Sequence, residues 1–306
     1  MNYFNNDTLI YHNGEFVKAA DAKINLYSQS LHYGYSVFEG IRSYKTIAGT
    51  NKIFKEKEHF ERLRNSALAI NMPYPFDDND LIKAAYEVLR LNNLGDSYIR
   101  PLVYAPANMT YALNTESYIA IQAWPMQPFL GDKNLRIMTS PFQRPNPRGF
   151  MIHAKAGGHY VNSIIASQDA KKNGYDEALL EDMDGYIAEG PGANVFIEKN
   201  KKIYTPSLGN ILPGITRATV LEICNDFGIP VEEKKITQIE LKDAENAFFC
   251  GTAAEVIGWK SIDNHDFPGI WENSISYIIQ QAYKALIRED MDLYEAQRKI
   301  YFSRNK

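Results

Sequence analysis

A single lysine stands among small residues in the stretch Ala154-Lys155-Ala156-Gly157-Gly158, just past the middle of the chain. Two glycines and a following helical pattern allow the backbone to be approached closely and the amine to lose water. Such surroundings favour the neutral amine, which is the nucleophilic form needed for a Schiff base. A surface lysine in a turn is the alternative interpretation, because most lysines are exposed.

Six further motifs surround this stretch in a fixed order. They are His32–Gly34, Val37–Arg42, Tyr98–Pro101, Gly185–Phe196, Leu212–Arg217 and Gly251–Glu255. In this order the set closely resembles the branched-chain aminotransferases, members of the fold-type IV family that uses pyridoxal phosphate (PLP). The resemblance runs from about Tyr11 to about Ile262, which is most of the chain.

The resemblance implies a two-domain fold of mixed α+β and α/β character, D-amino acid aminotransferase-like, with the cofactor between the domains. Residues 125–133 contain two prolines and a glycine without periodicity, and we expect the interdomain linker there. The smaller α+β domain is then residues 1–124, and the larger PLP-binding domain is residues 134–306.

The family also implies which residues hold the cofactor. Lys155 matches the catalytic lysine that binds PLP and later moves a proton. Glu189 matches the partner of the ring nitrogen, and Tyr160 matches a tyrosine that hydrogen-bonds the phenolic oxygen. The other predicted cofactor-binding residues are Arg62, Leu212, Ile215, Thr216 and Thr252.

The phosphate has a separate physical argument. Pro213-Gly214-Ile215-Thr216 opens a predicted helix, where exposed amides and the helix dipole attract an anion. Thr252 adds a hydroxyl from another element, and the fork of Arg62 suits phosphate geometry. Each residue also has an ordinary alternative. Arg62 and Glu189 could be solvated surface charges, and Tyr160 and Leu212 could be core side chains.

Substrate positions follow from the resemblance as well. An aromatic and aliphatic lining would bury a branched side chain, and the backbone amides of Thr252 and Ala253 would meet the α-carboxylate. Phe129 aligns with a linker tyrosine of bacterial relatives and lacks its hydroxyl donor. The remaining predicted substrate residues are Tyr33, Phe38, Gly40, Arg42, Tyr98 and Arg100.

The sequence therefore predicts transamination of leucine, isoleucine or valine with 2-oxoglutarate, giving branched 2-oxo acids and glutamate. Related activities share the fold. D-amino acid transaminases tend to carry Arg-x-His where this chain has Arg100-Pro101-Leu102, and aminodeoxychorismate lyases usually lack the pattern around Tyr98–Arg100. An R-selective amine transaminase and a non-catalytic binding protein on the same fold are further alternatives.

Composition excludes other partners. The net charge of −4 gives no basic footprint for nucleic acid or an anionic membrane. No apolar run approaches the roughly 20 residues that span a bilayer, and no signal peptide is apparent. The two cysteines fit a reducing compartment, so we expect a cytoplasmic enzyme. No metal site is predicted. The family implies a homodimer or higher homo-oligomer, in which some pocket residues act in trans.

Local patterns predict the secondary elements. Asn13-Gly14 indicates a hairpin, and Ser36–Tyr44 reads as one strand. Residues 271–288 form a long amphipathic pattern, and the polar tail after Asp290 reads as frayed. Further helices are expected at residues 57–70, 77–92, 160–173 and 216–227, and further strands at residues 53–54, 98–104, 118–124, 134–140, 178–181, 186–189, 194–198, 202–205 and 247–250.

Overall fold

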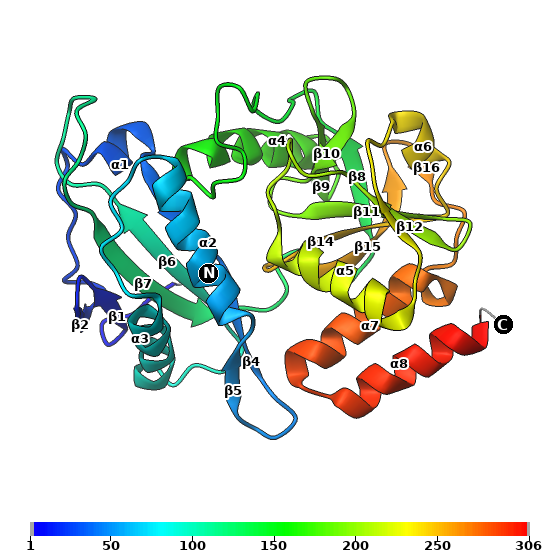
Figure 1. The fold of residues 1–306 in the computed structure, drawn as a ribbon, viewed down its shortest axis with the longest axis horizontal. Helices are drawn as coiled ribbons and strands as arrows, with labels where there is room; N and C mark the ends of the chain where they lie inside the picture. Colours follow the sequence, from blue (N-terminus) through cyan, green and yellow to red (C-terminus); the bar gives the residue numbers. More distant parts are fainter. Residues whose placement is uncertain (1–2, 305–306) are drawn as a thin grey trace. The chain divides into compact units, whose positions relative to one another are not determined.

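The computed structural model describes residues 3–304. It contains two β-sheets, one in each of two units (Figure 1). Contacts between Cα atoms group Met1–Gln127 with His153–Tyr160 as the first unit and Pro128–Ile152 with Val161–Lys306 as the second. The domain boundaries drawn from the sequence stay a prediction, and their outermost residues, 1–2 and 305–306, lie outside the described part.

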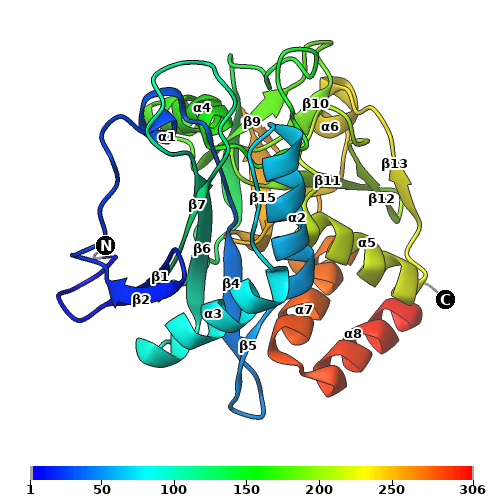
Figure 2. The same cartoon turned by 60° about the vertical axis from the view of Figure 1, so that its left-hand side comes forward.

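The first unit is an antiparallel sheet with two helices against it. The strand order is β2-β1-β7-β6-β4-β5, and β3 pairs with β6. Helices α2 and α3 contact each other, α2 contacts β3, and α3 contacts β1 and β7 (Figure 2). The elements are β1 Leu9–His12, β2 Glu15–Lys18, α1 Gln29–Tyr33, β3 Ser36–Phe38, β4 Ile41–Lys45, β5 Asn51–Ile53, α2 Glu56–Ala69, α3 Asp78–Leu91, β6 Ser97–Tyr104 and β7 Tyr118–Pro125.

Local signals place several of these elements correctly. The predicted hairpin is confirmed by the β1–β2 pairing, with φ of 51° at Asn13 and 98° at Gly14. A tight hairpin turn of type I′ requires a positive φ at both central residues, and Asn-Gly adopts these angles readily. Asp77 caps α3, because its side chain accepts hydrogen bonds from the backbone of Asn79 and Asp80.

The predicted single strand over Ser36–Tyr44 is wrong in one respect, because it is interrupted at Glu39 and Gly40. Both β3 and β4 pair with β6 in one register, Phe38 opposite Leu102 and Ile41 opposite Ile99. That register places Pro101 opposite Glu39. Proline has no N–H to donate, so the ladder is broken at this position.

The lysine stretch belongs to the first unit, whereas the sequence placed it in the second domain. Ala156 forms a bridge with Val37, and the backbone N–H of Phe38 donates to the carbonyl of Lys155 at 3.1 Å. Gly158 N–H donates to the carbonyl of Gly34 at 2.9 Å. A side chain at Gly34 would bring its Cβ to 2.7 Å from Gly158 Cα, so the close approach needs glycine at position 34.

The second unit is built on a larger sheet of order β10-β9-β8-β15-β14-β11-β12-β13, and β10 also pairs with β11. This extra pairing closes strands β8 to β11, β14 and β15 into a ring. Helices α5 and α7 contact β14, and α7 also contacts β15. The elements are β8 Leu135–Thr139, α4 Tyr160–Lys172, β9 Glu177–Glu181, β10 Ile187–Glu189, β11 Asn194–Lys199, β12 Lys202–Thr205, α5 Ile215–Phe227, β13 Val231–Glu233, α6 Gln238–Lys242, β14 Asn246–Gly251, β15 Glu255–Ile262, β16 His265–Asp266, α7 Ile275–Arg288 and α8 Met291–Arg304.

Two predictions for the C-terminal part are corrected. Residues 271–288 are a short 3-10 turn, Trp271–Asn273, and then α7, because the Ser274 hydroxyl accepts from Tyr277 N–H at 2.9 Å and caps a new helix. In the described part of the tail, Met291–Arg304 form a helix, α8, so the expectation of a frayed segment is wrong there. Tyr294 and Tyr301 are buried, and the Tyr294 hydroxyl donates to Asp226 on α5 at 2.9 Å.

None of the helices that the structure describes in residues 3–304 has the length and apolar character to cross a membrane. Both cysteines, Cys224 and Cys250, are free and buried. Burial raises the pKa of the Cys224 thiol to about 12 and raises that of Cys250 as well. Both thiols are therefore poor nucleophiles.

Candidate active site

Lys155 is half-buried and held at both its backbone and its side chain. The amine Nζ donates to the hydroxyl of Tyr160 at 2.8 Å. The backbone N–H donates to the Ser66 hydroxyl at 3.0 Å, on the inward face of α2. Lys155 and Tyr160 are therefore joined by a hydrogen bond, and both the backbone and the side chain of Lys155 are held in place.

Aromatic and cationic side chains from the neighbouring strands surround this amine. The ring centroid of Phe38 lies 5.3 Å from Lys155 Nζ, 4.7 Å from the Tyr160 ring and 4.5 Å from the Arg100 guanidinium carbon. Arg100 Nη2 donates to the Tyr98 hydroxyl at 3.1 Å. A Cβ at Gly40 would fall 1.9 Å from that hydroxyl, so only glycine fits there. Four predicted substrate positions thus form one cluster, which approaches the Lys155 amine through the Phe38 ring.

Arg62 lies on α2 and is paired with a residue to which the sequence gave no role. Its Nε lies 2.7 Å from Glu39 Oε1, and its Nη2 lies 2.9 Å from Oε2. His59 Nδ1 contacts Oε2 at 2.8 Å. The surface-arginine alternative is wrong, because only 12% of the Arg62 side chain is exposed.

Electrostatics fix the protonation of this group. Burial would raise the pKa of Glu39, but the cation of Arg62 and the hydrogen bond from His59 outweigh it and hold that pKa well below its usual range. Burial lowers the pKa of His59, and the charges of Arg62 and Lys155 lower it further. Glu39 acts in the opposite direction but does not outweigh them. His59 is therefore neutral and donates from Nδ1, since an ionised carboxylate only accepts.

Two predicted substrate residues lie elsewhere in the first unit. Tyr33 ends α1, is 47% exposed, and its ring centroid lies 6.0 Å from that of Tyr111. Arg42 is buried; its Nη2 donates to the carbonyl of Met126 at 2.8 Å, and its guanidinium carbon lies 5.0 Å from the Tyr44 ring centroid. Neither is seen in contact with Lys155, and their substrate roles stay predictions.

In the second unit, Glu189 is buried at the end of β10 and is surrounded by donors. Arg144 Nε lies 2.9 Å from Oε1, and Asn194 Nδ2 donates to Oε2 at 3.1 Å. The backbone N–H of Leu212 reaches both oxygens at 3.2 Å. The Arg144 cation and the N–H groups of Asn194 and Leu212 therefore all face the carboxylate oxygens. Sequence reasoning missed Arg144 and Asn194, although Asn194 is part of the quoted Gly185–Phe196 motif.

The segment after Leu212 leads directly into α5. Gly214 is the N-cap residue, and Ile215 and Thr216 form the first turn, with Thr216 buried. Asn194 ties this turn to Glu189, because its Nδ2 also donates to the carbonyl of Leu212 at 3.0 Å. A Cβ at Gly214 would lie 2.0 Å from Asn194 Oδ1, which explains the glycine. The predicted phosphate turn is therefore joined to the predicted ring-nitrogen partner.

Thr252, Ala253 and Phe129 lie together at the same edge of the second sheet. Glu189 pairs with Asn194, and Asn194 pairs with Cys250, directly before Gly251 and Thr252. The Phe129 N–H donates to the carbonyl of Ala253 at 2.8 Å. The Phe129 ring is 64% exposed, and its centroid lies 6.0 Å from Lys171 Nζ.

The donor set fits the predicted cofactor. A half-buried amine beside a phenol, a carboxylate and a helix N-terminus with a threonine are the groups that an aldehyde, a pyridine nitrogen and a phosphate require. Within the part of the chain that the structure describes, no cluster of three or more histidine, cysteine, aspartate or glutamate side chains could hold a metal ion.

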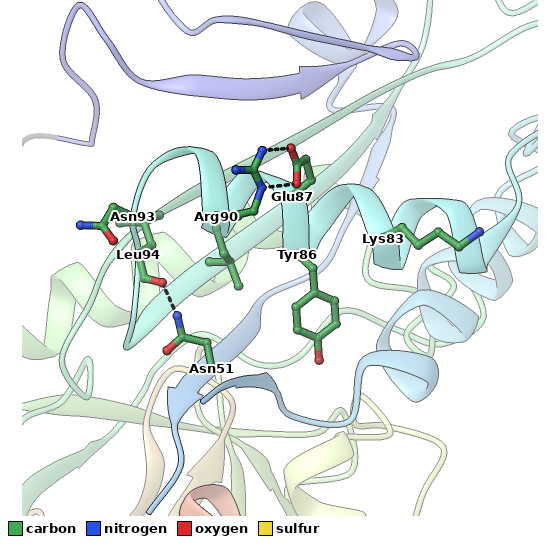
Figure 3. Close-up of a pocket in the computed structure, with 8 residues that line it drawn as sticks. Asn51, Lys83, Tyr86, Glu87, Arg90, Asn93 and Leu94 are labelled. Carbon is green, nitrogen blue, oxygen red and sulfur yellow. Dashed lines mark hydrogen bonds and ion pairs between the residues drawn. The ribbon is translucent and has the colours of Figure 1, made fainter. Parts of the chain in front are cut away.

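A surface cavity of about 590 Å³ lies on α3 and carries none of the predicted site residues (Figure 3). Its polar groups bond to one another: Arg90 Nε donates to Glu87 at 2.7 Å, and Asn51 Nδ2 donates to the carbonyl of Leu94 at 2.7 Å. It is lined by Asn51, Lys83, Tyr86, Glu87, Leu89, Arg90, Asn93 and Leu94.

Known proteins match this chain over most of its length. The family described as amino-transferase class IV matches residues 36–262. The branched-chain-amino-acid aminotransferase of Pseudomonas aeruginosa is 38% identical over 293 residues, covering 94% of this chain and 95% of the relative. That of Escherichia coli strain K12 is 36% identical over 287 residues, covering 90% and 92%.

Solved structures agree. The branched-chain aminotransferase of Thermoproteus uzoniensis with norvaline has a TM-score of 0.90 at 35% identity, covering 94% of this chain and 97% of that one. The PLP form of the enzyme from Thermobaculum terrenum has a TM-score of 0.86 at 32% identity, covering 95% and 97%. The chain belongs to the class IV aminotransferases. The resemblance and the fold-type IV assignment drawn from the sequence are confirmed.

Proposed function

We propose that this protein is a PLP-dependent transaminase of branched-chain L-amino acids, which passes the amino group of leucine, isoleucine or valine to 2-oxoglutarate. The observation that carries the proposal is the hydrogen bond of 2.8 Å between Lys155 Nζ and the Tyr160 hydroxyl, in a chain that matches branched-chain-amino-acid aminotransferases over about nine-tenths of its length. Bound PLP supplies an electron sink for the carbanion formed at the substrate Cα.

The residues of the chain then have distinct tasks. Lys155 would hold the cofactor aldehyde, and its amine would move the proton of the substrate Cα. Tyr160 holds that amine and meets the phenolic oxygen. Glu189 would be the partner of the ring nitrogen and would keep it protonated, and Leu212 and Ile215 would contact the cofactor. Arg62, Thr216 and Thr252 bind the phosphate.

The same group of side chains supports the substrate proposal. Phe38, Tyr98 and Gly40 line the space beside Lys155 for a hydrocarbon side chain, which gains about 0.8 kcal/mol for each buried methylene group. Arg100 donates to a carboxylate of glutamate or 2-oxoglutarate, and the amides of Thr252 and Ala253 bind the α-carboxylate. Tyr33, Arg42 and Phe129 complete the predicted set.

We also propose that the chain forms a homodimer in the cytoplasm. Exposed apolar side chains gather around α1 and the loop that follows β6, where Asn108 N–H donates to the carbonyl of Tyr27 at 3.1 Å. Contiguous apolar patches of this kind mark interfaces. The exposed residues are Leu26, Tyr27, Leu31, Tyr33, Met109, Tyr111 and Leu113.

The test of the function is a panel of L- and D-amino acids with 2-oxoglutarate and added PLP, followed by glutamate formation. We expect turnover with L-leucine, L-isoleucine and L-valine. Turnover with D-amino acids alone, or with none of the panel, would overturn the proposal. Static light scattering of the same sample tests the dimer.

A further inference from the structure

Glu39 occupies the interruption between β3 and β4 and has no exposed surface. Its carboxylate receives Arg62 at two points, Nε at 2.7 Å and Nη2 at 2.9 Å, and His59 Nδ1 at 2.8 Å. A two-point fork fixes the plane of a guanidinium as well as its distance, which a single hydrogen bond does not.

The backbone around Glu39 is equally fixed. Its N–H donates to the carbonyl of Pro101 at 2.9 Å, and the preceding Phe38 N–H donates to the carbonyl of Lys155. A side chain at Gly40 is excluded by the Tyr98 hydroxyl. The carboxylate that orients Arg62 is therefore carried by the same short segment that holds the lysine stretch.

The charge of Glu39 works against a simple electrostatic role. A carboxylate beside Arg62 partly cancels the positive charge that would attract a phosphate. The benefit of Glu39 must therefore be geometric. An arginine side chain that is not held in place loses rotamer freedom when it binds a ligand, and Glu39 orders Arg62 beforehand. The Arg62 side chain keeps 12% of its surface exposed, so it remains reachable from outside the buried group.

We propose that Glu39 is a positioning residue that sets the guanidinium of Arg62 in the orientation required by the phosphate of PLP, with His59 holding the second oxygen of Glu39. The inference rests on the proposed function, which assigns the phosphate to Arg62. It predicts that Glu39 affects the binding of phosphorylated cofactor only.

The test compares the dissociation constants of PLP and of pyridoxal, which lacks the phosphate, measured by absorbance of the bound aldehyde. Glu39→Gln keeps the size of the side chain, but its amide accepts at one atom and presents N–H groups to Arg62 or His59. We expect this variant to weaken PLP by about ten-fold, the worth of one hydrogen bond to a charged group, and to leave pyridoxal nearly unchanged.

Glu198→Gln is the matched control, because Glu198 is a carboxylate in the second unit, 5% exposed and hydrogen-bonded to Ser276 N–H at 2.8 Å. This variant should leave the ratio of the two dissociation constants, that of pyridoxal divided by that of PLP, at the wild-type value. Arg62→Met tests the phosphate role of Arg62 directly and should lower the ratio. If it does so while Glu39→Gln leaves the ratio unchanged or binds PLP more tightly, the proposal for Glu39 is overturned. If Arg62→Met also leaves the ratio unchanged, the phosphate role of Arg62 fails as well.

Two further variants decide the matter if Glu39→Gln does not fold. Glu39→Asp keeps the charge but shortens the reach, and His59→Asn keeps a donor to the carboxylate. Positioning predicts a lowered ratio for Glu39→Asp and a ratio near wild type for His59→Asn. A wild-type ratio in Glu39→Asp would show that charge alone matters. The ³¹P resonance of bound PLP reports the same change without turnover, and it should shift in Glu39→Asp.

Discussion

Arg144 Nε lies 2.9 Å from Glu189 Oε1, and both side chains are more than nine-tenths buried. The two residues are 45 positions apart in sequence, and the pair places a cation beside the carboxylate that is proposed to bind the cofactor. Removing one partner of a buried ion pair leaves the other charge uncompensated, which costs about 3–5 kcal/mol. Arg144 therefore holds the Glu189 carboxylate in place.

We expect Arg144→Met to lower the free energy of unfolding by about 3 kcal/mol and to reduce transamination strongly, because Glu189 loses its cation. Arg136→Met is the control: Arg136 is 53% exposed, Nε lies 3.5 Å from Asp176, and such pairs contribute at most about 1 kcal/mol. Denaturant unfolding of both variants checks the prediction. Equal stability losses in the two variants would contradict it.

Lys155→Ala is expected to abolish transamination while the protein still folds. One amine must bind the cofactor and move the proton, so its loss costs many orders of magnitude in rate. Lys171→Ala, on the exposed last turn of α4, should retain activity. Borohydride reduction of the wild type followed by peptide mass mapping identifies the modified lysine. A reduced cofactor found on any other lysine would refute the assignment of Lys155.

Glu189→Gln is expected to bind PLP and lose most of its activity. The amide has the shape of the carboxylate but not the charge that keeps the ring nitrogen protonated, so the electron sink weakens. Glu177→Gln, a buried carboxylate on β9, is the control for burial and should stay active. Single-turnover rates with L-leucine measure the effect, and a near wild-type rate would make Glu189 a structural residue.

Local sequence signals predicted most elements, because the cause of each lies within a few residues. Asn13-Gly14 defines a turn by itself, and Gly228 ends α5 at φ 66°. The errors have longer-range causes. The break at Glu39 follows from Pro101 on the neighbouring strand, and α8 is stabilised by packing of Tyr294 and Tyr301, which the polar composition of the tail concealed.

The candidate site divides in the same way. Lys155 and Tyr160 are five residues apart, and the Lys155 amine donates to the Tyr160 hydroxyl at 2.8 Å. Glu39 stands in a quoted motif, but its partner Arg62 is 23 positions away, and nothing in either local pattern pairs them. A buried residue that acts by holding a second residue can be identified only from the folded structure, because the two residues are distant in sequence.

Acidification should destabilise the protein through His59. Burial, with help from Arg62 and Lys155, lowers the pKa of His59 below its usual value of about 6.5. The unfolded chain therefore takes up a proton first, and stability falls as pH drops below about 6.5, by at most about 1.4 kcal/mol per pH unit. The lowered pKa of Glu39 adds a further loss below its usual value of 4.5.

His59→Asn should remove the first of these losses, because asparagine offers a donor to Glu39 and does not titrate. Unfolding free energies of wild type and variant, measured between pH 7.5 and pH 5, should converge as the pH falls. Parallel curves would mean that His59 is not the group that titrates. Below about pH 4.5 both proteins should lose stability together, because Glu39 is present in both.

The remaining prediction concerns Phe129. A branched-chain transaminase must accept a hydrocarbon side chain and the carboxylate of glutamate in one pocket, and a buried carboxylate needs donors. Phe129 offers a ring without a hydroxyl, while its backbone is tied to Ala253 at 2.8 Å. We therefore expect 2-oxoglutarate to bind more weakly than branched substrates, by about 1 kcal/mol, the worth of one hydrogen bond.

Phe129→Tyr should then tighten 2-oxoglutarate by about five-fold and leave the kinetics with L-leucine nearly unchanged. Phe142→Tyr, at a ring that is 38% exposed in the same unit and was assigned no role in the site, is the control and should change neither constant. The KM for each substrate in the separate half-reactions checks this. An equal effect on both substrates, or none on either, would show that the Phe129 side chain does not line the pocket.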